Sequence, residues 1–122
     1  MTRFLFAAVL TLSAVVHGAA ALAHHGWSWT TGGNLEVTGI IKTAKLGNPH
    51  GVLTLDVEGE VWTVEVGQPW RNERAGLRDG DLAPGAEIRV IGEPAADRGE
   101  KRVKAERLFL GQREYILYPG RD

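Results

Sequence analysis

Two adjacent histidines, His24 and His25, follow a run of small residues near the start of the chain and carry its strongest chemical signal. The small residues in front of them, Ala21-Leu22-Ala23, are typical of a signal-peptidase site. Cleavage after Ala23 would give His24 a free α-amine beside its imidazole, and these two nitrogens can chelate one ion. Cu(II) favours nitrogen ligands in a square-planar or tetragonal arrangement. We therefore expect a divalent-metal site at the mature N-terminus, with copper as the first candidate.

A further imidazole is available from His50, in the loop-like segment 46–51 (LGNPHG). Its ring could complete a T-shaped set of three nitrogens with the amine and imidazole of His24, and His25 is the other candidate for that position. Such a set resembles the histidine brace of copper-binding secreted proteins. The competing interpretation is that His50 caps a backbone group in a turn and that the histidine pair is simply solvated.

The bond that is cut decides the coordination mode. The segment Ala19-Ala20-Ala21 is a second permissible cleavage box. A cut after Ala21 would make His24 the third residue, which binds Cu(II) or Ni(II) through the amine, two deprotonated amides and one imidazole. A cut after Ala23 makes His25 the second residue, which also binds Cu(II). Every mode needs neutral imidazole and a free amine, so metal affinity should fall as the pH falls.

Residues 1–23 have the composition of a secretory signal peptide. Arg3 supplies the positive charge, residues 4–16 are uncharged and mostly apolar, and small residues follow. The apolar run is shorter than the roughly 20 residues that cross a bilayer. We expect the mature chain, residues 24–122, to be periplasmic or secreted in a bacterial envelope, with no membrane span after cleavage. An uncleaved membrane anchor is the alternative.

The composition of the whole chain argues against several classes of protein. Cysteine is absent, so neither a disulfide nor a thiolate nucleophile is available. The 14 Lys and Arg are balanced by 15 Asp and Glu, without the basic run that binds nucleic acid. No Ser-His-Asp, paired-carboxylate or phosphate-loop arrangement is recognisable. We expect a binding protein and not an enzyme, with no cofactor other than a metal.

An arm, residues 24–34, precedes a domain, residues 35–122, in which apolar and polar residues mostly alternate. Period-two segments predict strands over residues 35–43, 52–57, 61–66, 87–92, 102–110 and 113–118. Pro69 and Gly76 suit the start and stop of a short helix. The order β-β-β-α-β-β is that of an OB-fold, a small antiparallel barrel with one short helix. An open antiparallel sheet with one helix is the alternative.

The remaining aromatic and charged residues have simpler interpretations. Trp27 and Trp29 share a face if the arm is extended, and they either form a platform for a ligand or pin the arm to the barrel. Pinning is favoured because an unpinned arm would be disordered, and it would also hold the N-terminus in place. Trp62 is expected in the core. Five charged residues are expected on a solvated face: Arg71, Glu73, Arg74, Arg78 and Asp79.

Three short motifs together resemble a known family. They are His24-His25-Gly26-Trp27-Ser28, Asn48-Pro49-His50, and Pro84-Gly85 before a late strand. They are similar to a family of small secreted bacterial domains of unknown function, whose signal ends at Ala-His-His-Gly-Trp and whose Asn-Pro-His precedes a strand. The resemblance covers essentially the whole mature chain. It implies an envelope location and a β-rich fold, and it brings no established activity.

Three functional hypotheses follow. The first is a periplasmic protein that binds Cu(II) or another divalent metal through the mature N-terminus and three histidines, His24, His25 and His50. The second is an OB-like interaction module that binds an envelope protein or glycan without metal. A redox or oxygenase role for a bound copper is a third alternative.

Overall fold

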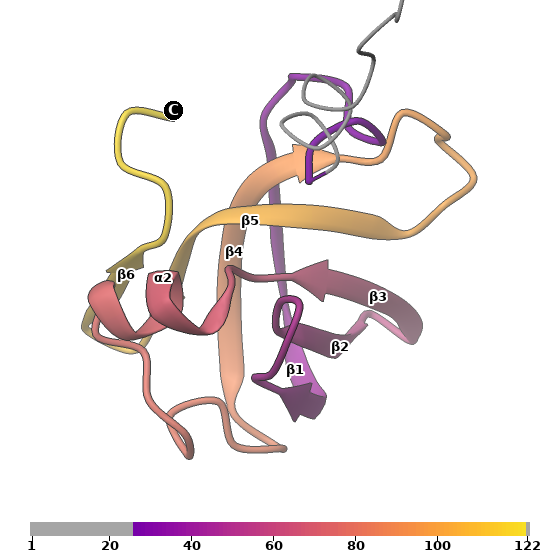
Figure 1. Ribbon diagram of the computed structural model, residues 1–122. Helices are drawn as coiled ribbons and strands as arrows, with labels where there is room; N and C mark the ends of the chain where they lie inside the picture. The colour runs from indigo at the N-terminus through magenta and orange to yellow at the C-terminus, as the bar shows by residue number, and fades with distance from the viewer. Residues whose placement is uncertain (1–25, 122) are drawn as a thin grey trace, which may run out of the picture.

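The computed structural model describes residues 26–121, which form six strands and one helix (Figure 1). In chain order they are β1 Leu35–Lys45, β2 Val52–Val57, β3 Glu60–Glu65, α2 Pro69–Arg74, β4 Glu87–Pro94, β5 Arg102–Leu110 and β6 Arg113–Ile116. The predicted signal peptide, His24 and His25 lie outside the described residues. The one helix among residues 26–121, α2, is not long and apolar enough to cross a bilayer.

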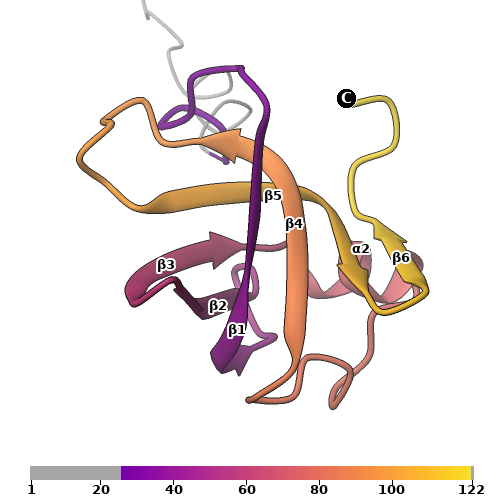
Figure 2. The same ribbon diagram turned by 180° about the vertical axis from the view of Figure 1, so that it is seen from behind.

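The strands close into a barrel. β1 pairs antiparallel with β2 and β4, β2 pairs with β3, and β4 pairs with β5. A parallel pairing between β3 and β5 closes the ring, and β6 extends β5 as an antiparallel hairpin. In Figures 1 and 2, β1 and β4 run steeply across β3 and β5. The predicted barrel and its element order are confirmed, and the open-sheet alternative is wrong.

The barrel interior is filled by the apolar faces that the period-two pattern predicts. Its fully buried side chains include Ile41, Leu53, Leu55, Val64, Ile88, Val90, Val103 and Leu108. Burying a side chain of this size stabilises the fold by about 1.5–3 kcal/mol. Trp62, which was expected inside the core, is only partly buried and packs against its edge.

β5 is buried on both faces. Val103 and Ala105 face the core, whereas Lys104 and Glu106 face the opposite side and are also buried. The neighbouring strand β4 comes so close that a Cβ atom on Gly92 would lie 2.0 Å from the backbone oxygen of Lys104. Glycine is therefore required at this crossing. The arm and the C-terminal tail, residues 117–121, cover the outer face of β5 and enclose the site described below.

The arm is held against the end of β4 by backbone contacts. Thr30 forms an isolated antiparallel bridge with Ala95. The N–H of Thr31 donates to the carbonyl of Pro94 at 3.1 Å, and the N–H of Ala96 donates to the carbonyl of Trp29 at 2.8 Å. These contacts attach residues 29–31 of the arm to the barrel, as the pinning interpretation requires.

Candidate functional site

A cavity of about 510 Å³ lies between the arm, the loop before β2, the start of α2 and the outer face of β5. Small-molecule sites typically occupy about 300–1,000 Å³. The arm contributes Gly26, Trp27 and Trp29 to its lining, and the loop contributes Pro49 and His50. Segments that are far apart in the sequence therefore meet at one hollow, and the functional residues must be sought among the side chains that face it.

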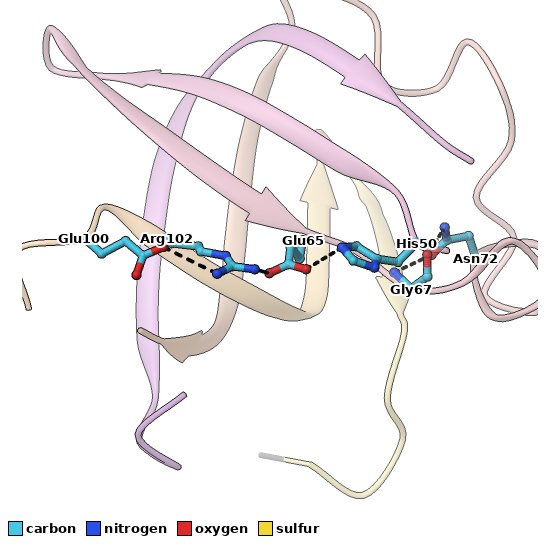
Figure 3. A network of polar contacts seen from close by, with 6 residues as sticks. All are labelled: His50, Glu65, Gly67, Asn72, Glu100 and Arg102. Carbon is cyan, nitrogen blue, oxygen red and sulfur yellow. Dashed lines mark hydrogen bonds and ion pairs between the residues drawn. The ribbon is translucent and has the colours of Figure 1, made fainter. Parts of the chain in front are cut away.

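Glu65 contacts both His50 and Arg102 (Figure 3), and all three side chains line this cavity. The Nε2 atom of His50 contacts carboxylate oxygen Oε1, and the guanidinium of Arg102 contacts oxygen Oε2. The Glu65 side chain is only 4% exposed. Arg102 also pairs with Glu100 at 3.4 Å and lies 3.8 Å from the ring centroid of Trp29. A buried carboxylate needs such partners, and these two fix the direction in which Glu65 points.

The pairing of β2 with β3 brings His50 beside Glu65. Val52, at the start of β2, is in register with Glu65, at the end of β3. The backbone continues this ladder, because the N–H of Gly51 donates to the carbonyl of Gly67 at 3.0 Å. His50 contacts a carboxylate and does not show the backbone cap that its loop position suggested.

Asn72 fixes α2 at the rim of the cavity. Its carboxamide oxygen accepts a hydrogen bond from the N–H of Gly67, and its amide donates to the carbonyl of Gly67, both at 2.8 Å (Figure 3). Asn72 is 3% exposed. The Asn72 side chain thereby satisfies both backbone groups of Gly67, in the segment between β3 and α2. The preceding helix residue, Arg71, lies beside the cavity.

Lys104 projects from the outer face of β5 into the cavity and is 4% exposed. Its ammonium lies 5.6 Å from the ring centroid of Trp27 and 5.8 Å from that of Tyr118. Among residues 26–121, no hydrogen-bond acceptor and no carboxylate is paired with this ammonium. Burial lowers the pKa of Lys104. The Glu65 carboxylate opposes this shift, and the neighbouring arginines, Arg102 and Arg71, add to it.

Arg71 packs against aromatic rings beside the same cavity. Its guanidinium carbon lies 4.5 Å from the ring centroid of Trp70 and 4.1 Å from that of Tyr118. The Nη1 nitrogen of the same guanidinium donates a hydrogen bond to the carbonyl of Leu117 at 3.1 Å. Arg71 is only partly solvated, because the C-terminal tail folds against the helix, whereas the other four charged residues of the predicted solvated face are exposed: Glu73, Arg74, Arg78 and Asp79. Burial raises the pKa of the Tyr118 phenol.

Glu93 ties the arm to the tail. The Thr30 hydroxyl donates to one of its carboxylate oxygens at 2.6 Å, and the guanidinium of Arg121 donates to the other at 3.1 Å. Arg121 also lies 3.8 Å from the ring centroid of Trp27, which meets the Tyr118 ring edge-on at 4.9 Å. The predicted pinning role of Trp27 is confirmed, and the same ring lines the cavity.

Of the three predicted metal ligands, the structure describes only His50. Gly26, which directly follows His25, lines the same cavity as His50. Within residues 26–121, no three His, Asp or Glu side chains converge as a metal-binding group. His50 and Glu65 are therefore two neighbouring potential ligands, and further ligands would have to come from His24 and His25.

Comparison with known proteins places the chain in a family. The family described as "Family of unknown function (DUF6152)" matches residues 12–103, which is most of the sequence. The chain belongs to this family. Membership in DUF6152 confirms the resemblance at the level of the family and supplies no activity. A search of curated proteins gives no match to this sequence.

Solved structures similar to this DUF6152 domain show its fold. The S. pombe Stn1–Ten1 complex matches with a TM-score of 0.50 and 21% identity over 66% of this chain and 59% of that one. The yeast Stn1 and Ten1 structure gives 0.50 and 11% over 66% and 43%. The ZRD-deleted mutant of TiaS, in complex with agmatine, gives 0.52 and 13% over 69% and 26%. This chain thus spans less than two thirds of each matched chain, and the likeness shows an OB-fold-like barrel alone.

Proposed function

We propose that this protein is exported to the periplasm or secreted, and that it binds a divalent metal, with Cu(II) as the first candidate, where its mature N-terminus meets His50. One observation carries the proposal: Gly26 and His50 line a single cavity. Consecutive Cα atoms are about 3.8 Å apart. A stretch of two residues spans at most about 8 Å, a reach that is compatible with ligands from His24 and His25 at this cavity.

The proposed ligands are the α-amine and imidazole of His24, with imidazoles from His25 and His50 and the carboxylate of Glu65. The Nε2 atom of His50 already faces an oxygen of Glu65, so an ion entering between them could bind both. Nitrogen ligands with one carboxylate suit Cu(II) and Zn(II). Arg102, on the other oxygen of Glu65, would orient this ligand as an outer-shell partner.

The charge of the cavity wall restricts where the metal can bind. Arg71 and Lys104 both face the cavity and repel a cation, whereas the charge of Arg102 is compensated by Glu65. Two unit charges 4 Å apart interact by about 4 kcal/mol at an effective dielectric constant of 20. We therefore place the metal at the edge of the cavity that holds His50, where coordinate bonds offset this repulsion.

Metal titration of the mature protein tests this function. The intact mass of the exported protein first establishes which residue carries the free amine. Competition titrations with Cu(II) and Zn(II) then compare the native protein with His50→Ala and Glu65→Gln, and Glu60→Gln serves as an exposed control on the same strand. We expect both cavity variants to weaken binding about 10–100-fold and the control to leave it unchanged. Equal affinities in all four proteins would refute the shared site.

An interaction module for an envelope protein or glycan is the second candidate function. The rings of Trp27, Trp29 and Tyr118 in the cavity lining favour it, because aromatic side chains with a few polar groups are typical of ligand sites. This function needs no metal. Binding of a partner that survives complete removal of metal, with no metal bound at one equivalent, would favour it over the first proposal.

A further inference from the structure

Among residues 26–121, the buried ammonium of Lys104 makes no ion pair and no hydrogen bond, although the Glu65 carboxylate is near enough to act on its pKa. It lies on a strand face that the arm and tail cover, 5.6 Å from the ring centroid of Trp27 and 5.8 Å from that of Tyr118. Burying an ionised ammonium without a hydrogen-bonded counter-charge is unfavourable. A lysine in a cavity wall avoids this cost when a ligand brings the missing oxygen acceptors.

Arg71 gives the cavity a second uncompensated positive charge. Its guanidinium contacts the Tyr118 ring, as the Lys104 ammonium does, and it makes no ion pair among residues 26–121. Arg102 differs, because its charge is compensated by Glu65 and Glu100. Both positive groups contact one aromatic ring and both line the cavity, and charged N–H donors of this kind form strong hydrogen bonds with carboxylate and phosphate oxygens.

We propose that this cavity binds a small organic anion, with a carboxylate or phosphate group between Lys104 and Arg71 and a ring-shaped body against the aromatic lining. The lining rings are those of Trp27, Trp29 and Tyr118, and the volume of about 510 Å³ accommodates a single-ring molecule. The site goes beyond metal binding and does not depend on it, because Lys104 and Arg71 are cationic and do not bind a metal ion.

Binding of ring-bearing anions to metal-free mature protein tests the proposal. The probes are benzoate, glucuronate and phenyl phosphate, and benzamide, methyl glucoside and phenol are their neutral counterparts. Chelator-treated protein is titrated by calorimetry at pH 7, and Trp27 supplies a fluorescence signal. We expect at least one anion to bind at least tenfold more tightly than its neutral counterpart. Benzoate and phenyl phosphate distinguish the two oxyanion classes.

Lys104→Met and Arg71→Gln assign the binding to this cavity. A hydrogen bond to a charged group contributes enough that its loss should weaken anion binding about 10–100-fold. Lys101→Met is the matched control, since Lys101 also lies near a tryptophan, 5.4 Å from the Trp62 ring, but is exposed and outside the cavity. Failure of all three anions to bind, or equal binding in native protein and Lys104→Met, overturns the proposal whether or not the protein binds metal.

Discussion

Replacing Lys104 with methionine should stabilise the metal-free, ligand-free protein. Methionine has a similar length and no charge, so it keeps the contacts of the aliphatic chain. It removes the ammonium of a residue that is 4% exposed and that makes no ion pair among residues 26–121. Replacing even a buried ion pair with apolar groups of similar volume is often neutral or stabilising by about 1–4 kcal/mol, and Lys104 makes no ion pair among residues 26–121 to offset its burial. We expect a gain of about 1–3 kcal/mol in the free energy of unfolding at pH 7.

The pH dependence of this gain has a definite sign. Burial holds the pKa of Lys104 in the folded protein below its ordinary value of 10.5. Glu65 on β3 opposes the shift, and Arg102 on β5 and Arg71 on α2 increase it. Between the folded and unfolded pKa values the unfolded chain binds more protons, so the stability contributed by this residue rises with pH. The free-energy cost of burying the Lys104 ammonium is fully present below the pKa of the folded protein and disappears above 10.5. The gain in unfolding free energy from Lys104→Met should therefore shrink at alkaline pH.

Urea unfolding followed by tryptophan fluorescence measures the stability gain at pH 7 and its change with pH, and thermal unfolding provides a second measurement of the gain. A gain of 1 kcal/mol corresponds to a rise of about 4–8 °C in the melting temperature of a domain of about 60–100 residues. Lys101→Met, which removes an exposed lysine, should change the stability by less than about 0.5 kcal/mol. Loss of stability in Lys104→Met at pH 7, or a gain that grows toward pH 10.5, would show that the ammonium is stabilised in the folded protein and would refute the reasoning.

Three further substitutions test the parts that support the site. Asn72→Ala removes two buried 2.8 Å hydrogen bonds to Gly67 and should cost about 2–4 kcal/mol in urea unfolding, whereas a cost below 1 kcal/mol would mean that water replaces them. Gly92→Ala places a Cβ atom 2.0 Å from a backbone oxygen and should cost more than about 3 kcal/mol, against less than about 0.5 kcal/mol for Gly47→Ala, where the space is open. Glu93→Gln weakens the clasp between arm and tail and should increase proteolysis of the arm; an unchanged cleavage rate would contradict that role.

The barrel could be predicted from local sequence patterns. Alternation placed Leu53 and Ile88 inside, and Pro69 and Gly76 marked a helix that the structure ends at residue 74. These signals are local, because the pleat of a strand and the turn chemistry depend on neighbouring residues. Residue 76 has a φ of 87°, which suits glycine at a helix end.

The site itself was largely missed, and the reason is tertiary. Glu65 and Lys104 occupy positions that alternate with core residues, so the pattern assigns them to the solvent side of the barrel. Only the docking of the arm and tail, more than 30 residues away in sequence for Glu65, turns that side into a cavity wall. The sequence signal available for the site was the presence of two charged residues, Glu65 and Lys104, inside apolar strands. No local rule distinguishes an outer strand face in contact with solvent from one that other segments cover.

Electron paramagnetic resonance of the mature protein with one equivalent of Cu(II) tests the proposed metal site most directly. A peptide with the sequence of the first five mature residues is the control, because a free amine beside histidine binds Cu(II) without any fold. We predict one nitrogen-ligated species in the protein, distinct from that of the peptide and converted to a peptide-like spectrum by His50→Ala. A native spectrum identical to that of the peptide, or no nitrogen-ligated species at one equivalent, would contradict a site shared by the N-terminus and His50.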